Sequence, residues 1–170
     1  MPPSDTTVQE NNTTFPTDAK LAKKVIDRCN AIADKESILQ RQSYRMTSRQ
    51  LLRDTYNPSH PKRFKKAREA QQKLRTLAGR QLQELERCLE RKAKKKYTED
   101  LRLFNSVIQK IKSDKDKIYS LHKPFACWVA KGKAHKPYEY SNKIRLMVDP
   151  KSLVVLAIEP IISQMKQHSE

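Results

Sequence analysis

The chain is poor in apolar and aromatic residues and has no long hydrophobic run. Of its 170 residues, 36% are hydrophobic and 6% are aromatic. So little apolar material predicts one loosely packed, mainly helical body. No stretch approaches the roughly 20 apolar residues of a membrane span, and the N-terminus has no apolar signal-peptide segment. The sequence therefore predicts a soluble, cytoplasmic protein with no membrane partner.

Cysteine is also scarce, and the number of cysteines is odd. Cys29, Cys88 and Cys127 lie far apart, so the sequence contains neither a disulfide framework nor a Cys-x-x-Cys metal knuckle. We expect reduced, partly buried thiols. A zinc site made by His122, Cys127 and His135 is a minor alternative, because the spacing fits no standard pattern and a fourth ligand is missing.

Acidic residues are outnumbered almost two to one. The chain has 36 lysines and arginines against 19 aspartates and glutamates, which gives a net charge of +17. Such an excess favours a polyanionic partner, and nucleic acid is the first candidate.

The pattern of apolar residues predicts helices over most of the chain. Thr17 is a candidate N-cap for a helix with apolar positions Leu21, Val25, Ile26, Cys29, Ile32 and Ala33. Residues 38–56 predict a second helix. Residues 61–96 predict the longest one, with an apolar stripe that includes Phe64 and is narrow enough for a single partner helix. That partner is expected to be a helix capped by Thr98, so that the two form a hairpin.

After residue 116 the pattern changes to short β-branched or aromatic segments. These segments are residues 118–121, 126–129, 138–148 and 152–158, and prolines and a Lys-Gly-Lys sequence separate them. A further strand-like patch covers residues 6–9. The sequence therefore predicts an α+β fold, mostly helical, with two or three antiparallel strands in a small sheet at the C-terminal end.

Two segments far apart in the chain are similar to one family. The first is DTTVQE at residues 5–10, followed by FPTDAKL at 15–21, and the second is KIYSLH at 117–122, followed by KGKAHKPYEYSNK at 131–143. Together they resemble bacterial insertion-sequence transposases of the DDE class, whose catalytic domain has an RNase H-like fold. Where that family has phenylalanine and glycine, this chain has Tyr140 and Ser141, and the resemblance ends near Val148.

The resemblance implies a partial RNase H-like domain. Residues 1–17 would be an extended lead-in with a first-strand remnant, and residues 18–116 a helical insertion containing a long hairpin. Residues 117–148 would supply strands of the sheet, and residues 149–170 would be a divergent tail.

The resemblance also implies a role for Asp5, as the first of three carboxylates that hold two divalent ions, Mg²⁺ or Mn²⁺. Such ions polarise the scissile phosphate and activate the attacking oxygen. The family's second aspartate belongs to an Asp-x-Gly-Tyr motif, but the only glycines here are Gly79 and Gly132, and neither follows such an aspartate. The family's glutamate signature contains an arginine, and no arginine follows Arg145. We therefore expect a DNA-binding fragment that is inactive alone and binds no metal tightly.

A cluster of basic and aromatic residues near the second motif is the candidate DNA-binding site. It comprises Lys131, Lys133, His135, Lys136, Tyr138 and Lys143, and the first four are expected in a loop. Cations there could contact phosphates and the ring could contact bases or sugars, although a solvated basic loop is the simpler alternative. The expected partners are DNA and an intact transposase or complementing fragment. A non-enzymatic nucleic-acid-binding protein and, less favoured, a helical scaffold are the competing hypotheses.

Overall fold

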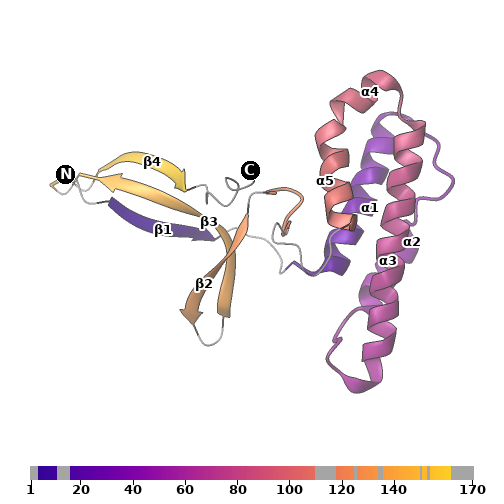
Figure 1. Ribbon diagram of the computed structural model, residues 1–170, viewed down its shortest axis with the longest axis horizontal. Helices are drawn as coiled ribbons and strands as arrows, with labels where there is room; N and C mark the ends of the chain where they lie inside the picture. The colour runs from indigo at the N-terminus through magenta and orange to yellow at the C-terminus, as the bar shows by residue number, and fades with distance from the viewer. Residues whose placement is uncertain are drawn as a thin grey trace, which may run out of the picture. The chain divides into compact units, whose positions relative to one another are not determined.

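The computed structural model describes residues 4–10, 16–109, 118–124, 126–133, 136–149, 151–152 and 154–161. The chain divides into two compact units, one made of residues 16–124 and the other of residues 1–15 and 125–170. The first contains all the described helices and the second all the described strands (Figure 1). The prediction of an α+β, mostly helical chain is confirmed.

The first helix, α1 (Asp18–Lys35), begins where the sequence predicts it to begin. The Thr17 hydroxyl accepts a hydrogen bond from the Lys20 amide at 3.3 Å, which satisfies one of the free donors of the first turn. All six predicted apolar residues of this helix are buried. The helix ends in a Schellman motif, in which the Ile38 amide donates to the Ala33 carbonyl at 2.8 Å and Ser37 takes a left-handed φ of 53°.

The second helix, α2 (Arg45–Asp54), is shorter than the predicted span of 38–56. The Schellman motif and a second left-handed residue, Tyr44 at φ 52°, keep the chain out of helical conformation until Arg45. Neither position is a glycine, so the sequence contains no signal for either left-handed residue.

The predicted helix over residues 61–96 is two helices, α3 (Pro61–Cys88) and α4 (Arg91–Lys96). Leu89 and Glu90 between them are extended, with ψ values of 126° and 156°. Leu89 is 6% exposed, so the break places its side chain in the core instead of on the solvated surface of a continuous helix.

The prediction that α3 packs against one partner helix is wrong, because α3 contacts α1, α2 and α5 (Thr98–Gln109). Its buried face is wide and includes small residues, which let neighbouring helices approach closely. The buried residues are Ala67, Ala70, Leu74, Ala78, Gln81, Leu82 and Leu85. Phe64, predicted to belong to this face, is 56% exposed.

Thr98 begins α5 but interacts differently from a capping residue. Its hydroxyl donates to the carbonyls of Lys94 and Lys95, at 2.9 and 3.1 Å, and so links α5 to the end of α4. Residues 118–121, predicted to be a strand, are irregular, and Leu121 packs into the helical core instead.

The second unit is a four-stranded antiparallel sheet of β1 (Ser4–Glu10), β2 (Cys127–Lys133), β3 (Lys136–Val148) and β4 (Val155–Ile161). The long strand β3 is central (Figure 1). Ser141 pairs with both Glu10 and Cys127, so β1 and β2 lie on opposite edges of β3. Three of the four strands, β2, β3 and β4, lie at the C-terminal end, where the sequence predicts two or three. The strand-like patch at residues 6–9 lies in β1.

Candidate nucleic-acid interface

Asp5 lies on β1, directly opposite Leu146 of β3. The pairing joins two segments of the chain that are separated by more than a hundred residues. Lys143, another predicted site residue, lies opposite Val8 on the same pair of strands. The sheet thus brings Asp5 and Lys143 onto neighbouring strands, three residue positions apart along the register.

The predicted basic loop is mostly strand. Lys131 and Lys133 lie on β2, and Lys136 and Tyr138 lie on β3, where Lys133 pairs with Lys136 and Ala130 with Tyr138. His135 lies outside the described residues. The hydrogen-bonded ladder of a hairpin therefore fixes the backbone of these cations, and the pairing shifts register between Ala130 and Lys133.

The structure describes the thiols of two of the three cysteines, which the sequence predicts to be reduced and partly buried. Cys29 and Cys88 are free thiols, the first buried and the second exposed. Among the residues whose side chains are described, no group of three or more histidine, cysteine or acidic residues could hold a metal ion. The alternative zinc site depends in part on His135, outside the described residues.

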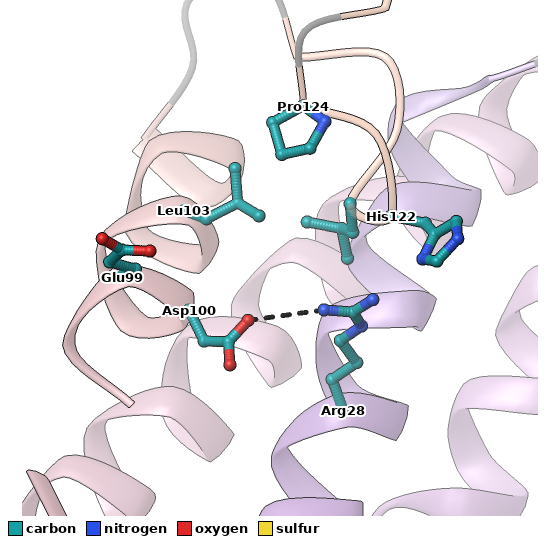
Figure 2. Close-up of a pocket in the computed structure, with 7 residues that line it drawn as sticks. Arg28, Glu99, Asp100, Leu103, His122 and Pro124 are labelled. Atoms are coloured by element: carbon teal, nitrogen blue, oxygen red, sulfur yellow. Dashed lines mark hydrogen bonds and ion pairs between the residues drawn. The ribbon is translucent and has the colours of Figure 1, made fainter. Parts of the chain in front are cut away.

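A groove of about 430 Å³ lies in the helical unit, between α1, α5 and the segment after α5 (Figure 2). Its lining residues are Arg28, Glu99, Asp100, Leu103, Leu121, His122 and Pro124. The Arg28 guanidinium is 3.4 Å from the Asp100 carboxylate, and both side chains are about 40% exposed. Since Asp100 partners this cation and Glu99 adds a second negative charge, the groove does not favour a polyanion.

Two of the lysines of the short basic helix α4 interact with neighbouring residues of the helical unit. The Lys96 ammonium lies 2.9 Å from Glu36 and 4.8 Å from the centre of the Tyr97 ring. The Tyr97 hydroxyl donates to Glu36 at 2.6 Å, and these two hydrogen bonds, first from Tyr97 and then from Lys96, lower the pKa of Glu36. The Lys94 ammonium donates to the Glu86 carbonyl at 3.0 Å. Of the six residues of α4, Lys94 and Lys96 therefore hold the helix in place.

The helix α3 carries an exposed row of cations that the sequence analysis did not single out. The basic row consists of Lys62, Lys66, Lys73, Arg80 and Arg87, all exposed, at intervals of four or seven residues. Such intervals place side chains on one face of a helix, here an exposed face beside the buried one. In the part of the chain that the structure describes, Lys66 is the only member in an ion pair, with Asp54 at 2.8 Å. The seven-residue spacing is the sequence signal that could have found it.

Comparisons with known proteins identify no family for the chain. No protein-family model matches the chain, and no curated protein or solved structure is significantly similar to it. None of the described helices combines the length and the apolar character needed to cross a membrane.

Proposed function

We propose that the chain is part of a DDE-class transposase that binds DNA but does not cleave it alone. The supporting observation is the antiparallel pairing of β1 with β3. These strands carry the two sequence segments that resemble the family, so their pairing brings the two segments together in one sheet.

The carboxylates of the chain do not complete the family's two-ion site. Asp5 corresponds to the first family carboxylate, and the motifs with the other two are absent from the 170 residues. Glu10, the other acidic residue of β1, is five residues from Asp5, about 17 Å along a strand, which is too far to share an ion. Mg²⁺ or Mn²⁺ would polarise the scissile phosphate in the intact family, and Asp5 by itself holds neither ion tightly.

DNA is the proposed partner because of charge. The net charge of +17 supplies the electrostatic attraction that accounts for most non-specific DNA binding. Lys131, Lys133, Lys136, Tyr138 and Lys143 are proposed to contribute contacts near Asp5, and His135 stays a prediction. A second polypeptide, either an intact transposase or a complementing fragment, would have to supply the missing carboxylates. The site of action is the cytoplasm.

The test measures cleavage and binding together. Supercoiled plasmid is incubated with the chain and Mg²⁺ or Mn²⁺, and nicking is compared among wild type, Asp5→Asn and Glu10→Gln, the last a matched control on the same strand. We expect all three to bind DNA and none to nick it. Nicking that Asp5→Asn abolishes and Glu10→Gln retains would show that other carboxylates complete the site, and the proposal of an inactive fragment would be wrong.

A non-enzymatic nucleic-acid-binding protein is distinguished by complementation. When a polypeptide with the two missing carboxylates is added, a transposase fragment gains Asp5-dependent nicking. A protein in which Asp5 has no metal-binding role gains none.

A further inference from the structure

The exposed face of α3 carries an inference that rests on the proposed function and deepens it. We propose that the basic row, Lys62, Lys66, Lys73, Arg80 and Arg87, is the surface that contacts the phosphate backbone of double-helical DNA. The row belongs to the helical unit, in which no residue was assigned to DNA by the sequence analysis.

The length of the row matches the repeat of the proposed partner. From Lys62 to Arg87 the helix rises about 37 Å, at about 1.5 Å per residue. One turn of B-DNA is about 34–36 Å long. The duplex presents one phosphate for about every 1.7 Å of its axis, so each long cationic side chain has several phosphates within reach. A straight helix of this length can therefore lie along one side of the duplex for about one turn and contact the phosphates that face it.

The charge of the row is available to a ligand. Lys62, Lys73, Arg80 and Arg87 form no ion pair within the described residues. Of the acidic residues on α3, Glu69 is exposed and Glu84 and Glu86 are half-buried. The carboxylates of Glu84 and Glu86 are engaged within the helical unit, where they accept from the Arg41 amide at 2.7 Å and the Asn105 side chain at 3.0 Å. The row therefore presents an excess of positive charge to solvent.

The packing of α3 holds the row in position. Leu74, Ala78, Leu82 and Leu85 on the buried face are at most 2% exposed, and they lie against the neighbouring helices. A row built on a packed helix is ordered before a ligand arrives, so binding costs less conformational entropy than it would in a flexible segment.

The composition of the face favours a duplex over other polyanions. The exposed positions between the cations are Glu69, Thr76 and Gln83, which are polar and not aromatic, whereas Ala70 is buried and Leu77 and Glu84 are half-buried. Binding of single strands depends on aromatic rings on which bases stack, and binding of a membrane surface depends on an exposed apolar face. The row offers only cations and polar groups, which suit phosphates on the outside of a duplex.

The test compares two variants with equal loss of charge. The row variant is Lys73→Gln with Arg80→Gln and Arg87→Gln. The control variant is Lys24→Gln with Lys35→Gln and Arg102→Gln, three exposed cations on α1 and α5. All six side chains are exposed, so both variants should fold, and circular dichroism with urea unfolding checks this.

The readout is affinity for a fluorescent duplex of about two turns, measured over a range of salt concentrations. We expect the row variant to reduce the slope of log K against log salt by about 2.7, that is by about 0.9 for each lost phosphate contact. The control variant should reduce it by less than a third of that amount.

Three other outcomes would contradict the assignment, the choice of partner or the proposed function. Equal losses in the two variants would overturn the assignment to the row while leaving DNA binding by the full chain intact. Tighter binding to single-stranded DNA, to an RNA duplex or to acidic lipid vesicles than to the DNA duplex would overturn the choice of partner. No binding of the wild type to any DNA would contradict this inference and the proposed function together, whereas nicking results bear on the proposed function alone.

Discussion

Two buried polar side chains join α1 to α3. Gln81, which is fully buried, donates from its side-chain amide to Asn30 at 2.9 Å, and Asn30 donates to the Ser43 carbonyl at 2.8 Å. Buried polar groups that bond to each other fix how two helices align, because a shifted arrangement would leave them without partners. The pair therefore specifies the packing of α1 on α3 and the path of the segment before α2.

Replacing Gln81 tests this hydrogen-bonded pair. Gln81→Ala removes the donor to Asn30 and should lower the free energy of unfolding by about 1–3 kcal/mol. Gln72→Ala, an exposed change of the same type on the same helix, should alter it by less than about 0.5 kcal/mol. Urea unfolding measures both variants, and equal effects would show that Gln81 is not buried as described.

Because the Cys29 thiol is buried, the free energy of unfolding should depend on pH in the alkaline range. Burial, and to a smaller extent the charge of Glu86, raise the pKa of Cys29 from 9.0 to about 12. Between these values the unfolded chain binds fewer protons than the folded one, so the free energy of unfolding falls as pH rises. The loss from this group is at most about 1.4 kcal/mol per pH unit.

Urea unfolding from about pH 8 to 11 measures the effect of Cys29. The Cys29→Ala variant should lose less stability over this range than the wild type does. Cys88→Ala, at an exposed position, should keep the wild-type dependence. If the wild type and the Cys29 variant have the same dependence, the thiol is not buried in the folded protein.

At the scale of elements, the sequence predicts helices better than it predicts their ends. The apolar spacing and Thr17 locate α1 correctly, because burial and capping both leave a signal in residue type. The end of α1 at Ser37 and the delayed start of α2 at Arg45 leave none, because non-glycine residues take the left-handed conformation there. The break at Leu89 depends on burial of a single side chain, which only the folded core determines.

For the candidate site, too, the sequence predicts some features, and the folded structure determines the others. The two segments that resemble the transposase family predict which residues to consider, but not that Lys131 and Lys136 would be on paired strands. The row on α3 was missed because a charged helix face is most often simply solvated. It becomes a candidate only when burial establishes which face of α3 is free.

Gly79 tests how closely α3 and α5 pack. A methyl group added at this position would lie 3.8 Å from the Ile108 side chain, an ordinary contact distance. Gly79→Ala should therefore stabilise the protein by about 0.5–1 kcal/mol, since alanine favours the helix and restricts the unfolded chain. The midpoint of urea unfolding should rise. A fall would show that α5 lies closer to α3 than described.

At the scale of the whole molecule, the main hydrophobic cluster formed by the described side chains belongs to one unit. Every residue of the main hydrophobic cluster lies between Ala19 and Leu121, within residues 16–124. The charge of the chain, by contrast, is distributed over both units. Substitutions at buried core positions are therefore expected to lower stability, and substitutions of exposed cations are expected to weaken DNA binding.

A polypeptide of residues 16–124 should accordingly fold by itself. Its circular dichroism should be helical, and it should unfold in one cooperative urea transition with about the midpoint of the full chain, because it contains the main hydrophobic cluster of the described residues. A non-cooperative transition would mean that the sheet unit contributes to the core.

The most direct test of the account is the affinity of the full chain for a duplex of about 20 base pairs as the salt concentration is raised. Binding by cationic side chains releases counterions, so log K should fall linearly with log salt, with a slope of about −0.9 for each phosphate contacted. We expect tight binding at low salt and a slope steeper than about −3. Absence of binding, or an affinity that salt does not change, would contradict it.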